Sequence, residues 1–591
     1  MMKKLLAVAL SLGLVGFSVP APAQANSGDD GVKIKHVLLI SIDGMHAVDY
    51  INCSQGLATV NNGAPYCPHL AALGKTGVSY RDTSTSRTSD SFPGLTAIIT
   101  GASPRTAGAF YDVAYDRVLA PPTITTGNGV AGGTCTPNQP NGTTTEYEEG
   151  IDKNQQFVNG IDGISTANGD GGINSIDPQK LIRDPFNGCA PVYPWDFVRT
   201  NSIFSVIHNA GGYTAWSDKH PAYASVAGHG TGGKTLDDFF GPEINSVPVS
   251  LPGVVAQGVT CDPLPDQSAV ASSNAWTDSF ANIKCYDQLK INAVLNEING
   301  KTHNGSKPAP RPTILGMNFQ TVSIGQKLIE KSLSPKVTGG YEDSIGTPTP
   351  ALLGEIEFTD ASIGDMIKAL KKNGIYSETL VIITAKHGQS PIDSARYLGI
   401  SNSTGDPVTT SPANILDALN CLPASESPSG PGIGPTEDDV SLLWLNSNCT
   451  TEFAVSQLRS QSPTTNNIAG IGEIFSGPIL RTYFNAPGLP PTGDPRTPDI
   501  VVTPNIGVTY SGSTKKLAEH GGFSRDDTNV MILVSNPSLD GKVVTSAVET
   551  SQVAPTILKA LGLNPKLLDG VRIEGTQELP GLPFGKSSED E

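Results

Sequence analysis

Residues 36–44 read His36-Val37-Leu38-Leu39-Ile40-Ser41-Ile42-Asp43-Gly44, an unbroken apolar run that ends in an acid and a glycine. Such a run is typical of a central parallel strand that is covered on both faces of its sheet. Four later runs have the same character, at residues 313–317, 380–384, 500–503 and 530–534. Together they predict several buried strands distributed over most of the chain.

Helical patterns alternate with these runs. The clearest covers residues 350–372, where Leu353, Ile356 and Ile363 recur at helical spacing before the stop signal Asn373-Gly374. Another covers residues 553–561. This alternation predicts an α/β fold with a doubly wound, mostly parallel central sheet and helices on both of its faces.

The composition excludes several classes of protein. The chain has 591 residues, with 39 Lys and Arg against 56 Asp and Glu, and a formal net charge of −17. A protein this acidic is poorly suited to a nucleic-acid polymer as partner, because such binding neutralises many phosphates. Hydrophobic residues make up 38% of the chain, which is enough for a large core. The 64 glycines and 46 prolines indicate long ordered loops around that core.

The first 25 residues have the pattern of a cleaved signal peptide. Lys3 and Lys4 precede an apolar run at residues 5–19, and Ala23-Gln24-Ala25 supplies a small-residue cleavage site. The run is shorter than the roughly 20 residues of a membrane span, and we expect no span elsewhere. The pattern predicts export to a periplasm or the cell exterior, and the sequence indicates no protein partner.

The eight cysteines agree with an oxidising compartment. No two of them form a CxxC motif, so structural disulfides are favoured over a zinc cluster. Eight cysteines allow 105 connectivities. The simplest prediction pairs sequence neighbours, because each bridge then closes one local loop: Cys53–Cys67, Cys135–Cys189, Cys261–Cys285 and Cys421–Cys449.

Long loop-like stretches interrupt the alternation of strands and helices. Residues 121–180, 245–310 and 395–495 are rich in Gly, Pro, Ser, Asn or Thr. We interpret them as insertions on one scaffold, the last being long enough for a small cap. The expected organisation is a signal peptide at 1–25 and a single domain at 26–591.

Ligands of such sheets bind beyond the carboxyl ends of the strands, so ionisable residues there are the candidates for chemistry. Asp43 ends the first strand. Ser91 lies just before Pro93, which suits the first turn of a helix, and free N–H groups at a helix start favour a nearby anion. An ordinary N-cap is the alternative for Ser91.

Two histidines that precede glycines complete the set. Lys386-His387-Gly388 follows the run at 380–384, and His520-Gly521 comes late in the chain. Each pair alone is more often a structural turn. Their order behind Asp43 and Ser91 favours a joint site.

This order of motifs resembles the type I phosphodiesterase/nucleotide pyrophosphatase family of the alkaline phosphatase superfamily. The resemblance extends over about residues 35–565 outside the insertions. Its motifs are Ser41-Ile42-Asp43-Gly44, Ser91-Phe92-Pro93, Leu95-Thr96, Thr100-Gly101, Tyr111-Asp112, Tyr115-Asp116, Lys386-His387-Gly388 and His520-Gly521.

The resemblance implies a metal-dependent phosphoryl-transfer site. It implies two zinc ions and a covalent intermediate on Ser91, because coordination activates a hydroxyl that is otherwise a weak nucleophile. Asp43, Ser91 and His387 would hold one ion, and His520 would contribute to the other. Asp112 falls near the place of the family's substrate-binding Asn.

Two departures indicate that the family's standard two-zinc site is not intact. The family's Pro-Asp-x-x-Gly-His should follow the strand at 313–317, but residues 318–327 contain neither ligand. Lys386 replaces an expected Asp. Three explanations remain open: Lys386 stands in for one metal, other acids such as Asp90 or Asp112 are recruited, or the chain is a catalytically inactive binding protein.

Lys219-His220 adds a further possibility, because it resembles the sulfatase segment in which Lys and His bind sulfate. A surface turn is the alternative for this pair. The sequence thus predicts hydrolysis of a small phosphate ester or diester through Ser91, with a divalent metal, zinc first, as one ion or two. Lys386, Lys219, His220 and Asp112 are the predicted substrate-binding residues. A sulfatase-like or other one-metal ester hydrolase is the second interpretation.

Overall fold

The computed structural model describes residues 33–147, 150–153, 173–245, 251–272, 276–400, 410–461, 470–484, 494–511 and 513–584. All of them belong to one compact unit, Val32–Glu591. The predicted signal peptide at 1–25 lies outside the described residues, as do parts of the three predicted insertions.

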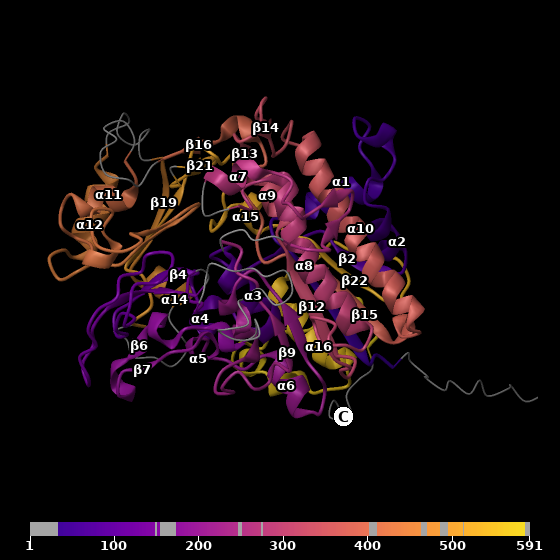
Figure 1. Cartoon of the computed structure of the whole chain (residues 1–591). Coiled ribbons are helices and arrows are strands. Elements are labelled where there is room, and N and C mark those ends of the chain that lie inside the picture. The colour runs from indigo at the N-terminus through magenta and orange to yellow at the C-terminus, as the bar shows by residue number, and fades with distance from the viewer. Residues whose placement is uncertain are drawn as a thin grey trace, which may run out of the picture. The chain divides into compact units, whose positions relative to one another are not determined.

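A central sheet of eight strands organises this unit (Figure 1). All its neighbouring pairs are parallel except the two made by β22, which is antiparallel to both neighbours. The mostly parallel sheet predicted from the sequence is confirmed. In spatial order the strands are β23 (Lys542–Val544), β2 (Gly77–Tyr80), β22 (Ile532–Ser535), β15 (Thr379–Thr384), β1 (His36–Ile42), β12 (Ile314–Phe319), β8 (Ala215–Ser217) and β9 (Asp238–Phe240).

The central strand β1 is buried on both faces, as its apolar run predicts. Successive side chains of a strand point to opposite faces, so Leu38 and Ile40 enter one hydrophobic core while Val37 and Leu39 enter the other. Neither face meets solvent. This explains why the run is continuously apolar instead of alternating.

Helices cover both faces of the sheet (Figure 1). The helix predicted at 350–372 is confirmed as α10, and that at 553–561 as α16. One face carries α1 (Ala47–Gln55), α2 (Pro68–Lys75), α8 (Phe280–Ile298), α9 (Thr321–Lys327) and α10 (Pro350–Lys372). The other carries α3 (Ser91–Thr100), α4 (Pro104–Ala107), α5 (Pro194–Phe197), α6 (Ile203–Asn209), α16 (Val553–Ala560) and α17 (Asp569–Glu574).

Helix α8 lies within the stretch 245–310 that the sequence analysis treats as a loop insertion. Its Ile283 and Val294 are fully buried against the sheet. The prolines and glycines of that stretch lie outside residues 280–298, so its average composition hides a regular helix.

The apolar run at 500–503 does not join the central sheet, which corrects the expectation of one continuous alternation. As β20 it belongs to a separate antiparallel sheet, drawn mostly in orange in Figure 1. Ile500 and Val502 pack into one small core and Val501 into another, so this strand too is buried on both faces. Its apolar run therefore cannot reveal which sheet it joins. The elements are β17 (Thr436–Glu437), β18 (Ser441–Leu443), β20 (Ile500–Pro504), β19 (Ile471–Ser476), α11 (Pro412–Asp417), α12 (Thr451–Arg459) and α14 (Pro478–Phe484).

Short ribbons and helices complete the described part of the chain. The paired strands are β3 (Thr83–Ser84) with β24 (Val548–Glu549), β4 (Val113–Asp116) with β5 (Thr143–Glu146), β6 (Arg183–Asp184) with β7 (Ala190–Pro191), β10 (Val255–Ala256) with β11 (Val259–Thr260), β13 (Ile329–Glu330) with β14 (Val337–Thr338), and β16 (Leu398–Gly399) with β21 (Val508–Thr509). The remaining α-helices are α7 (Gln267–Ser272) and α15 (Arg525–Thr528).

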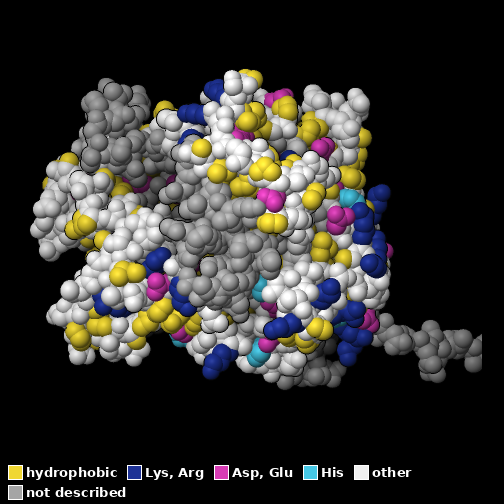
Figure 2. Space-filling view, viewed as in Figure 1, with side chains coloured by type: hydrophobic (Ala, Val, Ile, Leu, Met, Phe, Trp, Pro, Cys, Tyr) yellow, Lys and Arg dark blue, Asp and Glu magenta, His cyan; other side chains and the backbone are white. Residues whose placement is uncertain are grey.

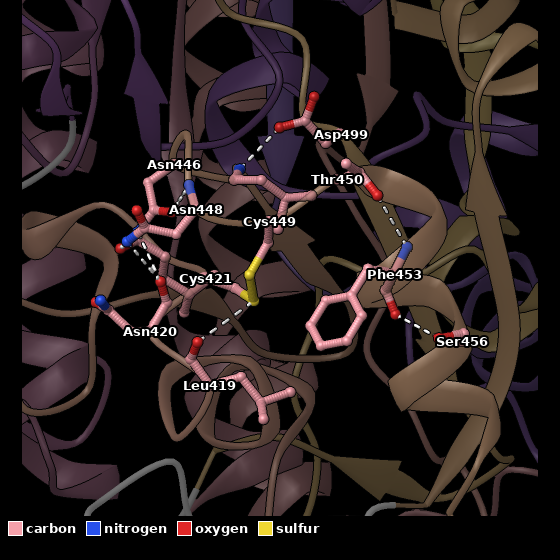
Figure 3. The surroundings of a disulfide bond; sticks show 12 residues. Leu419, Asn420, Cys421, Asn446, Asn448, Cys449, Thr450, Phe453, Ser456 and Asp499 are labelled. Atoms are coloured by element: carbon pink, nitrogen blue, oxygen red, sulfur yellow. Dashed lines mark hydrogen bonds between the residues drawn. A yellow bond between two sulfur atoms is a disulfide. The ribbon is translucent and has the colours of Figure 1, made fainter.

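All four disulfides join sequence neighbours, which confirms the predicted pairing. Figure 3 shows the bridge between Cys421 and Cys449, which ties the end of α11 to the segment before α12. The Asn446 amide side chain donates to the carbonyl of Asn420 at 3.0 Å, and the Asn446 N–H donates to Cys421 at 2.8 Å. The bridge closes a loop across a sequence separation of 28 residues. The entropy that it removes from the unfolded chain raises the free energy of unfolding by about 3.5 kcal/mol.

Charged side chains are sparse and of mixed sign on the face drawn in Figure 2. Basic side chains gather near the end of α10, where Lys371 and Lys372 are exposed. Among the described helices, none combines the length and the apolar composition that crossing a membrane requires.

Candidate active site

Four neighbouring parallel strands, β15, β1, β12 and β8, end at the same edge of the sheet. Their register places Ser41 of β1 beside Asn318 of β12 and Thr384 of β15. The residues that follow these strands therefore meet at one edge, as ligand-binding residues do in open α/β sheets.

Helix α3 carries Ser91 to this edge. Asp90 is the N-cap and accepts a hydrogen bond from the Phe92 N–H at 3.2 Å, so Ser91 is the first residue of the helix and is not its cap. Gly94 lets the helix approach the strand end closely, because a Cβ there would lie 2.2 Å from the Lys386 carbonyl oxygen. The glycine thus brings Ser91 next to the residues that follow β15.

The Ser91 hydroxyl lies among three ionisable side chains. Lys219 Nζ donates to Ser91 Oγ at 3.0 Å, and His387 Nε2 lies 3.1 Å from the same oxygen. Asp43 Oδ2 is 3.4 Å away. Ser91 and Asp43 are fully buried, and Lys219 and His387 nearly so. The structure therefore brings four of the predicted site residues together.

The surroundings of His387 fix its tautomer when the ring is neutral. Nδ1 lies 2.8 Å from the Gly388 carbonyl oxygen, which can only accept a hydrogen bond. Nδ1 then carries the proton, and Nε2 presents a lone pair to Ser91. His387 can therefore accept a hydrogen bond from the hydroxyl or bind a cation there.

Amide groups hold the Asp43 carboxylate. Asn318 Nδ2 donates to Oδ1 at 2.8 Å, and Gln320 Nε2 donates to Oδ2 at 2.7 Å. Burial alone would raise the pKa of Asp43, but the charges of Lys386 and Lys219 keep this pKa well below its ordinary value. Asp43 is thus an ionised carboxylate.

The loop that carries these amides is fixed from α8. Asp287 Oδ2 accepts the backbone N–H groups of Gln320 and Thr321 at 2.8 and 2.9 Å. Lys290 Nζ donates to the Asn318 carbonyl at 2.6 Å and pairs with Asp287 at 2.9 Å. Because all these contacts are buried, the amides have little freedom to leave Asp43.

Lys386, which replaces the family's Asp, contacts Asp218 and Tyr223. Its ammonium contacts Asp218 Oδ1 at 2.8 Å and lies 3.8 Å from the centre of the Tyr223 ring. An ion pair and a cation–π contact therefore hold this charge. Lys386 acts on Asp43 through its field.

The two residues of the Lys219-His220 pair separate. Lys219 reaches Ser91, whereas His220 Nδ1 lies 2.8 Å from Glu243 Oε1 and its ring stacks on Tyr223. His220 is fully buried and borders the aromatic contact of Lys386. The pair is therefore not a surface turn.

His520 lies against His387, with ring centres 4.0 Å apart. Its Nδ1 is 3.4 Å from Asp90 Oδ1, and the Asp112 N–H donates to Asp90 Oδ2 at 3.0 Å. The Tyr111 hydroxyl, which donates to Asp438 at 2.8 Å, packs over Gly521. Asp112 thus joins this side of the site through Asp90.

The distances between the donor atoms show whether these residues can hold a metal ion. Asp43 Oδ2, Ser91 Oγ and His387 Nε2 are separated from one another by 3.1, 3.4 and 3.7 Å. Ligands of a tetrahedral zinc at about 2.0–2.1 Å lie about 3.3 Å apart, so these three donors fit one ion.

A second ion does not fit. Of its expected donors only His520 is present, while Asn318 and Gln320 turn N–H groups toward Asp43. In the described part of the chain, no three His, Cys, Asp or Glu side chains gather as a metal site.

Sequence reasoning missed two residues that shape the site. Asp218 follows β8 and forms an ion pair with Lys386, and the Tyr223 ring makes a cation–π contact with the same ammonium. The strand-end rule could have found Asp218, because it directly follows a short apolar stretch. Nothing in the sequence indicates Tyr223, whose contact depends on tertiary packing.

Residues 37–145 and 338–524 match the model of the family described as type I phosphodiesterase/nucleotide pyrophosphatase. The match covers about half of the chain, and the chain belongs to this family. It is a phosphoester hydrolase, and the family's members are metal-dependent.

Solved structures of low sequence identity resemble this chain. Murine ectonucleotide pyrophosphatase/phosphodiesterase 5 is 14% identical, with 90% of this chain and 96% of that chain covered and a TM-score of 0.48. Phosphonoacetate hydrolase from Sinorhizobium meliloti 1021, in complex with phosphonoformate, is 14% identical with the same coverage and a TM-score of 0.47. No curated protein matches the chain.

Proposed function

We propose that this protein is an exported hydrolase of small phosphate esters or diesters that forms a covalent intermediate on Ser91. One observation carries the proposal: Ser91 Oγ lies at the start of α3 within 3.0–3.4 Å of Lys219, His387 and Asp43. A buried hydroxyl in contact with a cation and two acceptors is arranged to act as a nucleophile. The helix start favours the phosphate anion at the same place.

The reaction has two balanced halves. Ser91 Oγ forms a bond to phosphorus as the ester bond breaks, and the serine proton ends on the leaving oxygen. Water then attacks the phosphoserine, the Oγ–P bond breaks, and one proton returns to Ser91. The net change is ester plus water to alcohol plus phosphate for a monoester, and to alcohol plus a phosphate monoester for a diester.

Asp43, Ser91 and His387 are the residues that would hold one divalent cation, with zinc the first candidate. When bound, such an ion lowers the pKa of the hydroxyl that it ligates and offsets negative charge. Lys219 donates to Ser91, and the amides of Asn318 and Gln320 orient Asp43. We assign His520, next to His387 and Asp90, to contact with the substrate's oxygens. Asp112, whose N–H donates to Asp90, is assigned to the substrate-binding region beside it.

Export and a single decorated domain at 26–591 form part of the proposal. Four disulfides support an oxidising compartment, and the compact unit Val32–Glu591 supports one domain. N-terminal sequencing of the secreted protein tests both export and the cleavage after Ala25.

The test of Ser91 compares S91A with S86A, a control in a serine whose hydroxyl donates to Thr88. We expect S91A to lower kcat/KM on chromogenic phosphate mono- and diesters by roughly a thousandfold or more, and S86A to leave it unchanged. Acid quenching should trap phosphate on Ser91. An S91A variant with a tenth of the activity contradicts the proposal.

The same assay separates the other interpretations. A chromogenic sulfate ester that is turned over faster than both phosphates indicates a sulfatase. No turnover with added zinc, manganese or calcium, together with no bound metal, indicates a non-catalytic binding protein.

A further inference from the structure

We infer that the Lys219 ammonium replaces the family's second metal ion, so that Ser91 works with one divalent ion and one lysine. This inference rests on the proposed role of Ser91. It assigns Lys219 to the activation of the nucleophile, beyond the substrate binding that the sequence suggests.

The position of the ammonium carries the argument. Lys219 Nζ lies 3.0 Å from Ser91 Oγ and 4.0 Å from Asp43 Oδ2, so it contacts the nucleophile and faces the adjoining carboxylate. A positive charge beside the attacking oxygen stabilises the alkoxide that forms there. Only 7% of Lys219 is exposed, so water screens this charge weakly.

The backbone of Lys219 is held firmly in place. Its N–H donates to Asp218 Oδ1 at 2.8 Å. Its carbonyl accepts from the Tyr286 hydroxyl and from the Ile244 N–H, both at 3.1 Å. Because the side chain is also buried and donates to Ser91, little ordering remains when the reaction begins, which is what preorganised stabilisation requires.

The strand order explains why a lysine can replace an ion here. β8, which ends just before Asp218 and Lys219, pairs with β12, the strand after which the second ion's ligands are missing. Residues 318–327 there contain neither of the expected ligands, and Asn318 and Gln320 turn amide N–H groups toward Asp43. The strand next to the lost ligands thus supplies the missing positive charge.

Lys386 is not the replacement. Its ammonium is engaged elsewhere, 2.8 Å from Asp218 Oδ1 and 3.8 Å from the centre of the Tyr223 ring. Lys219 is the lysine whose ammonium contacts the nucleophile among the described residues.

The first experiment counts ions. The mature chain is stripped of metal, titrated with zinc, and analysed by native mass spectrometry and elemental analysis alongside activity. We expect one zinc per chain in the unmodified protein at full activity, and one zinc per chain in K219M despite its lower activity. A count of two at full activity, or full activity with none, overturns the inference.

The second experiment tests the charge with K219M, K219R and the control K368M, whose lysine lies exposed on α10. We expect K219M to lower kcat by roughly a hundredfold to a thousandfold with KM changed less than about threefold. K219R should recover part of the rate, K368M should match the parent, and phosphorylation of Ser91 should slow in K219M.

The outcomes separate this inference from the proposed function. If S91A stays active, the proposed function fails. If S91A is inactive while folded K219M keeps its kcat, or only its KM rises, the inference about Lys219 alone fails. Thermal melting verifies that each variant is folded, and the zinc count of the unmodified protein stands independently of any variant.

Discussion

The site has two sides of different character. On one side, α3 and the ends of β1 and β15 keep Ser91, Asp43 and His387, the residues that the family resemblance implies. On the other, the ends of β12 and β8 carry amides and Lys219. The segments that match the family model, 37–145 and 338–524, contain the first side, and the second lies between them.

The difference teaches that a site can retain its charge while it changes its ligands. Asp43 joins the two sides. Its oxygens accept hydrogen bonds from the amides of Asn318 and Gln320, and Ser91 and His387 lie next to it. Amides orient this carboxylate but add no positive charge to it. A cation from the neighbouring strand becomes necessary for that reason.

The largest expected effect comes from Asp43→Asn. It neutralises the carboxylate between the two sides and leaves Lys219 and Lys386 without its compensating charge. We expect kcat/KM to fall roughly a thousandfold or more and zinc to be lost. Gln320→Ala removes only one orienting amide and should cost roughly tenfold to a hundredfold. Steady-state kinetics and zinc content measure both.

Equal losses in the two variants would remove the distinction between the two sides. A D43N variant that keeps its zinc would show that Asp43 is no ligand.

The second prediction concerns Asn318→Asp, which restores an acid on the changed side. Its carboxylate would replace an amide nitrogen 2.8 Å from Asp43 Oδ1, and two buried carboxylates at that distance repel each other. Without metal, we expect the free energy of unfolding to fall by about 2–4 kcal/mol. Zinc should restore more stability to N318D than to the parent, as measured by denaturant unfolding with and without zinc.

Asn318→Ala is the matched control, since it loses the hydrogen bond without adding charge. If zinc affects N318D and N318A alike, the changed side has no capacity for an ion.

Local sequence patterns predict one side of the site far better than the other. Asp43, Ser91 and His387 are identifiable because a strand end or helix start places each, and those elements have strong local patterns. The cystine pairs and α10 are predictable for the same reason. The contact of Lys219 with Ser91 depends on the order of β8 beside β12, which local patterns do not encode. His220 contacts Glu243 and Tyr223 while Lys219 contacts Ser91. This difference likewise depends on tertiary packing, which local patterns do not encode.

The smallest expected effect lies outside both sides and tests whether effects on the site are local. Glu426 is buried near β5, and its carboxylate accepts the Thr144 hydroxyl at 2.6 Å. Burial raises the pKa of Glu426 to about 8. The folded protein therefore holds a proton there that the unfolded chain releases above its ordinary pKa of about 4.5. The stability from this proton is complete at low pH and is lost as the pH rises through about 8.

Glu426→Gln keeps the neutral form at every pH. We expect its free energy of unfolding to match the parent near pH 5 and to exceed it by about 2–4 kcal/mol near pH 9, with kcat/KM unchanged at pH 7. Denaturant unfolding from pH 5 to 9 measures the difference, and the exposed Glu452→Gln should leave the parent's profile unaltered. If the free energies of unfolding of E426Q and the parent change with pH in parallel, Glu426 does not hold a proton in the folded state. A change in kcat/KM would instead show that the region around Glu426 is coupled to the site, and that the two sides cannot be compared in isolation from it.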